Sequence, residues 1–141
     1  MMRPVNVIVM LIACCLALSG CTQLTHSTMR EEFDKSTKAY NRMLRWQEVE
    51  NAGMLYMEPE KRGEFMKRAE LLKKRGVTIT DFRILTTECL PEKKTGDVTA
   101  EFDYYILPSN RIKTVTYHQE WIYQDLIKNW KLSSGLPAFE E

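Results

Sequence analysis

Residues 98–124, VTAEFDYYILPSNRIKTVTYHQEWIYQ, alternate apolar and polar side chains on both sides of a turn. Successive side chains of a β-strand point to opposite faces, so this alternation predicts two half-buried strands, over about residues 98–106 and 112–124. Between them, residues 107–110 read LPSN, which favours a hairpin because proline fixes φ and asparagine tolerates a left-handed backbone. We expect an antiparallel hairpin with one apolar face.

Two more strands flank this hairpin. After Gly76 the pattern changes from helical to alternating, with a slip of register near Asp81 that a bulge would absorb. A last strand carries Trp130 and Leu132. In the strand at 112–124 the alternation predicts one buried face and one exposed face: Val115, Tyr117, Trp121 and Tyr123 against Thr116, His118 and Glu120.

Two helices precede the strands. Thr28 and Glu31 have the spacing of a capping box, and the helix that they start should reach about Asn51 and end at Gly53. A second helix starts at Glu58-Pro59-Glu60 and ends on basic residues 73–75 before Gly76. The predicted fold is α+β, with two N-terminal helices packed on a curved four-stranded antiparallel sheet.

The first 21 residues, MMRPVNVIVMLIACCLALSGC, have the form of an export signal. One positive charge precedes an apolar stretch, and small residues precede a cysteine. The apolar stretch is shorter than the roughly 20 residues that a membrane-spanning helix needs, which favours cleavage. An ordinary signal peptide cut near Gly20 and a retained membrane anchor are the alternatives.

Leu18-Ser19-Gly20-Cys21 resembles the lipobox of bacterial lipoproteins. The resemblance implies that the signal is cut between Gly20 and Cys21 and that Cys21 carries the acyl chains. Thr22 takes the place of the aspartate that keeps such lipoproteins in the inner membrane, so the expected address is the periplasmic face of the outer membrane. We expect a signal peptide at 1–20, a lipidated cysteine and tether at 21–27, and one α+β domain at 28–141.

The composition limits the possible functions. With 20 Lys and Arg against 19 Asp and Glu, and 44% hydrophobic residues, the chain is neither a disordered tail nor a strongly basic nucleic-acid binder. Of the four cysteines only Cys89 lies beyond the signal and the lipobox, and we expect it to be a small buried hydrophobe. We expect no cofactor and no metal, since the sequence has neither a phosphate-binding glycine loop nor a metal-ligand motif.

The element order resembles the nuclear transport factor 2-like cone fold, and more narrowly a group of uncharacterised proteobacterial lipoproteins of that shape. The stretches that carry the resemblance are Leu44-Arg45-Trp46, Glu58-Pro59-Glu60, residues 104–109, Gln119-Glu120-Trp121 and Trp130-Lys131-Leu132. The resemblance implies a fold and an address. Some cone-fold proteins are small isomerases or dehydratases, which gives an alternative function with His118 and Asp103 or Glu120 as acid and base. The strand alternation turns these three side chains outward, so we expect no catalysis.

Three surfaces remain as candidates for binding. Trp46 departs from the apolar stripe of the first helix; we expect it to be buried, and its exposure would make Trp46 with Tyr56 a partner site. The basic residues around the end of the second helix (Lys67, Arg68, Lys73, Lys74 and Arg75) are expected to form a solvated face rather than a lipid contact. The open sheet face could support a homo-oligomer. The function that we expect is a non-catalytic, lipid-anchored binding or accessory domain with an envelope protein as partner.

Overall fold

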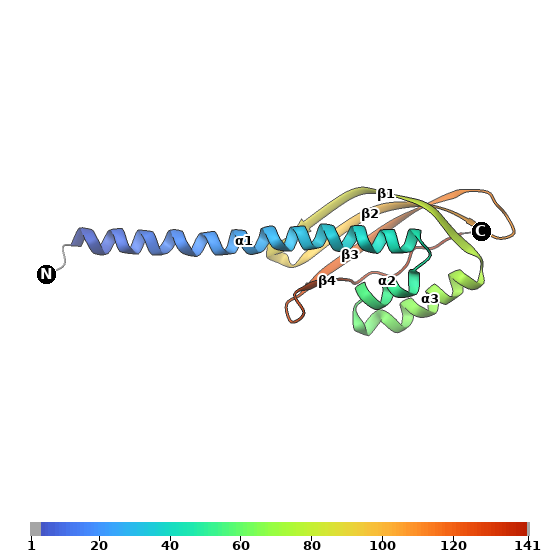
Figure 1. Ribbon diagram of the computed structural model, residues 1–141, viewed down its shortest axis with the longest axis horizontal. Helices are drawn as coiled ribbons and strands as arrows, with labels where there is room; N and C mark the ends of the chain where they lie inside the picture. The colour runs from blue at the N-terminus through green and yellow to red at the C-terminus, as the bar shows by residue number, and fades with distance from the viewer. Residues whose placement is uncertain (1–3, 141) are drawn as a thin grey trace.

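The computed structural model describes the backbone of residues 4–140 and the side chains of residues 23–140. In that part of the chain, three α-helices and two short 3-10 turns accompany four strands. Figure 1 shows the C-terminal half of α1 lying lengthwise along the sheet, with α2 and α3 beside its C-terminal end, while the N-terminal half extends beyond the sheet. The bounds are α1 Pro4–Arg45, α2 Val49–Tyr56, η1 Pro59–Lys61, α3 Arg62–Lys74, β1 Val77–Leu90, η2 Pro91–Lys93, β2 Thr95–Ile106, β3 Lys113–Gln124 and β4 Asn129–Leu132.

The strands form a sheet in the order β1-β2-β3-β4, with every neighbouring pair antiparallel. This confirms the predicted α+β class with helices on an antiparallel sheet. The slip near Asp81 is confirmed as a register shift between Ile79 and Asp81, and a second shift lies between Ile84 and Thr86. The predicted faces of β3 are also confirmed, since Tyr117 and Trp121 are buried while Thr116, His118 and Glu120 are exposed.

The predicted start of the first helix at Thr28 is wrong, because α1 runs without a break from Pro4 to Arg45. The Thr28 hydroxyl donates to the carbonyl oxygen of Leu24 at 3.0 Å, as hydroxyls inside a helix do, and it does not cap a helix end. No proline or glycine lies between Cys21 and Thr28 to interrupt the helix. Within the described chain, no helix is long and apolar enough to cross a membrane.

The predicted end of that helix near Gly53 is also wrong. The helix stops at Arg45, Gln47 takes a left-handed backbone with φ of 63°, and α2 starts at Val49. The side-chain amide of Gln47 donates to the Ile79 carbonyl oxygen at 2.7 Å and accepts from the Ile79 amide at 3.4 Å. The Gln47 side-chain amide thus bonds both backbone groups of Ile79, as the backbone of a neighbouring strand would. A local sequence pattern does not reveal this long-range contact.

A buried amide pair joins α1 to the centre of the sheet. Gln119 Nε2 on β3 donates to Asn41 Oδ1 at 2.6 Å, and Asn41 Nδ2 donates to Gln119 Oε1 at 3.3 Å. Asn41 also donates to the Thr37 carbonyl oxygen, and Trp121 Nε1 donates to Gln119 Oε1. Next to this pair, the hydroxyls of Tyr40 and Tyr117 lie 2.8 Å apart. The Tyr40 ring packs against Tyr56 and Trp121, and the Tyr117 ring packs against Phe102.

The losses on removing the two amides should therefore not be additive. Asn41→Ala and Gln119→Ala each leave a buried amide unpaired, so each should lower the free energy of unfolding by roughly 1–3 kcal/mol. The double variant should lose clearly less than the two single losses together, by at least about 0.5 kcal/mol in a urea double-mutant cycle. The exposed Asn51 gives the control, since Asn51→Ala should stay within about 0.5 kcal/mol. Additive losses would show that the two amides do not interact.

Two helical glycines differ in the space around them. A Cβ at Gly53 in α2 would overlap the Phe65 ring, whereas a Cβ at Gly63 in α3 would meet nothing within 4 Å. Gly53→Ala should therefore destabilise the protein by about 1–3 kcal/mol through overpacking. Gly63→Ala should stabilise it by about 0.5–1 kcal/mol, because alanine is the better helix former. Thermal unfolding of both variants checks this, and equal shifts would contradict the close packing of α2 on α3.

Candidate functional site

Asp103 is held in an ion pair with Arg83 on the outer face of the sheet. Arg83 on β1 donates to both of its carboxylate oxygens, at 2.8 and 3.2 Å, and the Thr114 hydroxyl donates to Asp103 Oδ1 at 2.6 Å. The hydrogen bond from Arg83 and then that from Thr114 lower the pKa of the Asp103 carboxyl below its ordinary value. Arg83 also bonds Glu101 at 3.0 Å, so one guanidinium joins two carboxylates across the outer face of the sheet.

His118 and Glu120 lie apart from Asp103 along the sheet. Asp103 pairs with Thr114 and His118 pairs with Thr99, which places Asp103 and His118 four residues, roughly 13 Å, apart along the strands. His118 is exposed, and its Nδ1 lies 3.2 Å from the Thr99 hydroxyl. Among residues 23–140, no hydrogen bond or ion pair joins His118 to Asp103 or Glu120. The acid/base constellation that the sequence offered as an alternative is therefore not assembled.

The Arg83–Asp103 pair should have a small, pH-dependent effect on stability. Asp103 has a lowered pKa in the fold, so its stabilisation is present above the pKa of an unfolded aspartate and is lost as the pH falls through the folded value. Asp103→Asn should reduce the free energy of unfolding by less than about 1 kcal/mol at pH 7, as for other exposed pairs. The difference between the two proteins should disappear at the acid end of a urea series from pH 7 to below pH 3. A difference that is constant over this range would contradict the ionic contribution.

The inner face of the sheet is filled by side chains. The rings of Phe33, Trp121 and Trp130 pack there against each other and against α1, and Tyr40 and Tyr117 are buried. Burial raises the pKa of both tyrosine hydroxyls well above the ordinary value, so these hydroxyls stay neutral. This packing gives the interior a structural role.

An apolar cleft lies where α2, α3 and the start of β1 meet, at the end of the domain opposite to the one where α1 leaves (Figure 1). We call it the distal cleft. Its volume is about 320 Å³, and it is lined mostly by apolar groups: Val49, Ala69, Leu72, Val77, Ile79 and Leu107, with Gln47, Glu50, Lys73, Gly76 and Thr78. Glu50 and Lys73 lie 3.9 Å apart at its edge. The left-handed φ of 73° at Gly76 turns the chain from α3 into β1 and so forms one wall.

Trp46 is exposed, and the predicted burial is wrong. Its side chain is 64% accessible, and the Arg45 guanidinium lies over the ring at 5.1 Å from its centre. It precedes Gln47, which lines the distal cleft, so an exposed aromatic residue stands directly beside that cleft in the chain. Tyr56 does not join it: it lies at the other end of α2, and its ring packs on Tyr40 and Trp121.

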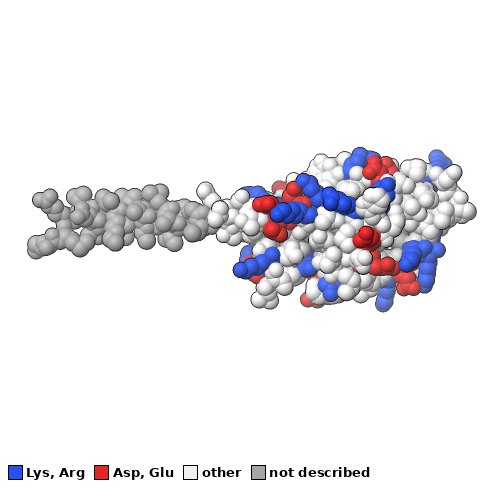
Figure 2. Space-filling view, in the orientation of Figure 1, with Lys and Arg blue, Asp and Glu red and all other residues white. Residues whose placement is uncertain are grey.

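The remaining sequence candidates are Cys89 and the basic residues around the end of α3. Cys89 is half-buried against the core, and burial raises the pKa of its thiol, as expected for an inert cysteine. In the basic stretch, Lys74 pairs with Glu70 at 2.9 Å and Arg75 donates to the Phe139 carbonyl oxygen. Figure 2 shows basic and acidic side chains interspersed over one face of the domain. Among the described residues, no group of three His, Cys, Asp or Glu could hold a metal ion.

Sequence reasoning missed the distal cleft and the buried amide pair. The amide pair could have been found from the sequence. Asn41 lies eight residues after Phe33, on the apolar stripe of the first helix, and Gln119 alternates onto the same strand face as Tyr117 and Trp121. No sequence pattern indicates the cleft, since its walls come from separate segments that only the fold brings together. The side chains of Gly20 and Cys21, the predicted cleavage and lipidation site, lie outside the described side chains.

The chain matches no protein-family model and no curated protein. Among solved structures it is similar to the intermembrane space region of the chloroplast protein ARC6, with a TM-score of 0.48 and 13% sequence identity over 74% of this chain and 97% of that one. A likeness of this degree does not bear on function.

Proposed function

We propose that this protein is a lipid-anchored accessory domain on the periplasmic face of the outer membrane, and that it binds an envelope protein through the distal cleft. The observation that carries the proposal is the place of the cleft. It is an apolar surface lined by Gln47, the residue after the exposed Trp46, and it lies at the end of the domain opposite to the N-terminal part of α1, which carries Cys21. A partner can therefore reach the cleft while Cys21 holds the other end at the membrane.

The anchor itself rests on the lipobox resemblance of Leu18-Ser19-Gly20-Cys21 and on the apolar stretch that precedes it. More than one acyl chain on Cys21 would give stable attachment, because a single chain binds only marginally. Thr22, in place of an aspartate, supports the outer membrane.

The chemistry of the cleft favours one or two apolar side chains of a partner segment. Its volume of about 320 Å³ is at the small end for a ligand pocket, and its walls are mostly aliphatic. Leu107 in the cleft wall is 60% exposed, and Trp46, the residue before Gln47 of the wall, is 64% exposed, so both side chains are accessible to a partner. Exposed aromatic residues such as Trp46 are common anchors of interfaces. No observation favours the isomerase or dehydratase alternative, since His118 and Asp103 are held apart on the outer face of the sheet.

Loss of the lipid should release the protein. Cys21→Ser removes the thiol that would be acylated, so the variant should move from the membrane fraction to the soluble envelope fraction and lack the mass of the acyl chains. Cys89→Ser, which removes the other cysteine beyond the signal, serves as the control and should stay in the membrane fraction. If Cys21→Ser stays in the membrane fraction with an unchanged mature mass, the lipoprotein interpretation is contradicted.

The cleft is tested separately by site-specific photo-crosslinking in intact cells. A photoreactive amino acid replaces Trp46 in the full-length protein, and Leu85, which is 51% exposed on β1 away from the cleft, gives the matched control. One recurrent envelope protein should be captured from position 46 and not from position 85. Capture of the same proteins from both positions would contradict binding at the cleft, and capture of a second copy of this chain from position 46 would assign the surface to a homo-oligomer.

A further inference from the structure

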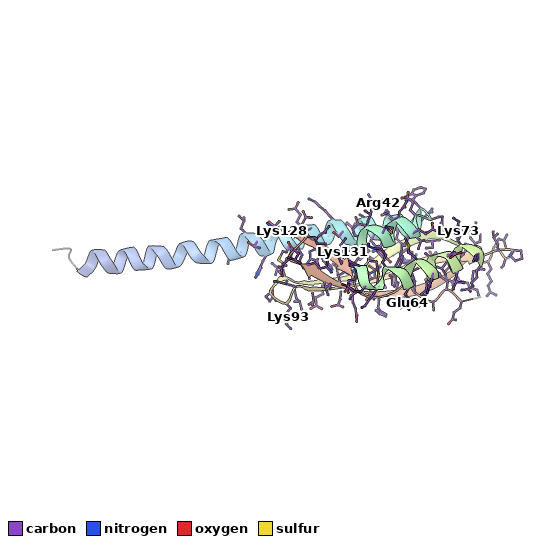
Figure 3. The ribbon with its side chains drawn as sticks, turned by 90° about the horizontal axis from the view of Figure 1, so that it is seen from below. Arg42, Glu64, Lys73, Lys93, Lys128 and Lys131 are labelled. Carbon is purple, nitrogen blue, oxygen red and sulfur yellow. The ribbon has the colours of Figure 1, made fainter. Side chains whose placement is uncertain are left out.

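Two turns of the sheet lie beside α1 at the end of the domain where that helix leaves it. We call this group the proximal end; it consists of α1 residues 25–29, η2 with Lys94, and the β3–β4 turn at residues 125–128. These segments line one shallow hollow, which includes Thr25, Met29, Pro91, Asp125 and Lys128. Figure 3 shows Lys93 and Lys128 at this end, on either side of the two turns.

The β3–β4 turn exposes two consecutive apolar side chains at its tip. Leu126 is 100% exposed and Ile127 is 53% exposed, whereas turns of this kind ordinarily carry polar residues. Neither side chain belongs to the hydrophobic core or to the partly buried residues that pack on it. Leu24, the residue before Thr25 of the proximal hollow, is a further exposed leucine at 74%. The fold gives these side chains no apolar contact surface of its own.

The unbroken helix sets how far this tip lies from Cys21. Thr25 lines the proximal hollow together with Asp125 and Lys128, so the β3–β4 turn lies next to that helical position. Cys21 is in the same helix, four residues earlier, which is about 6 Å along the axis at 1.5 Å per residue. A flexible tether would let the distance between Cys21 and the β3–β4 turn vary, whereas a continuous helix fixes that distance. If acyl chains on Cys21 enter a bilayer, the β3–β4 tip must lie at its headgroup region.

We infer that the proximal end is a lipid-binding surface in which Leu126 and Ile127 enter the boundary between headgroups and acyl chains. The inference rests on the lipid anchor of the proposed function and adds an orientation to it. Leucine and isoleucine at a loop tip gain free energy from burial in this boundary, as the apolar face of an interfacial helix does.

The charges of the two turns fit a lipid surface. Lys94 pairs with Asp125 at 2.5 Å, so these two charges largely cancel. Lys93 and Lys128 are exposed, and in the described chain neither forms an ion pair, so both ammonium groups can reach lipid phosphates. Glu92 is the acid in η2 that faces the same hollow, and it limits the net attraction. Apolar insertion at Leu126 and Ile127 is therefore the main contribution, with the two lysines at headgroup level.

The test measures depth in the full-length acylated protein. In a Cys89→Ser background, Leu126→Cys carries an environment-sensitive fluorophore, and the protein is reconstituted into vesicles of phosphatidylethanolamine and phosphatidylglycerol with a nitroxide near the top of the acyl chains. The matched control places the same probe at Ile112→Cys, an apolar residue that is 54% exposed in the β2–β3 turn at the distal end. The nitroxide should quench roughly half or more of the emission at position 126 and less than about a tenth at position 112.

The outcomes separate this inference from the proposed anchor. A protein that carries acyl chains and sediments with the vesicles, but shows no quenching at position 126, would overturn the lipid-binding tip and leave the anchor intact. Equal quenching at positions 126 and 112 would also overturn it, because the domain would then have no fixed orientation. A protein without acyl mass that stays in solution would contradict the anchor itself. Adding Ile127→Asp to the Leu126→Cys variant should reduce the quenching at least about two-fold.

Discussion

The reciprocal hydrogen bonds between Asn41 and Gln119 hold the rest of the structure in place. Two amides buried among aromatic rings are stable only when each satisfies the other, so α1 has one position along β3. That position puts Tyr40 against Tyr117 and Phe33 against Trp121 and Trp130. It also determines which part of α1 extends beyond the sheet toward Cys21, and which part ends near the start of β1.

The interactions at the two ends of the domain follow from this placement. At the distal end, α1 stops at Arg45, Gln47 pairs with Ile79, and the chain turns into α2, which leaves the cleft open beside Trp46. At the proximal end the helix continues past Met29, whose carbonyl oxygen accepts a hydrogen bond from Trp130 Nε1 at 2.9 Å. A single continuous helix thus joins the segment that contains Cys21 to the turn that precedes the cleft.

The sequence predicts the elements that depend on local patterns. Alternation identified the faces of β3, the slip near Asp81 marked a register shift, and Gly76 marked the end of α3, because each depends on neighbouring residues. The sequence patterns gave wrong element boundaries where a residue distant in the chain determines the backbone conformation. The helix break at Gln47 depends on Ile79, and the capping box at Thr28 lies inside a continuous helix. For the site, Asp103 was correctly expected to point outward, but the cleft depends on four separate segments and was not foreseen.

We propose that the domain stands directly on the membrane at one end and presents the distal cleft at the other. Neutron reflectometry of the full-length acylated protein on a supported bilayer tests this claim most directly. We predict protein density that begins within the headgroup layer and continues outward without a water layer between bilayer and domain. A hydrated gap of about 15 Å or more, the span of a flexible tether of the length predicted at residues 21–27, would contradict this direct contact.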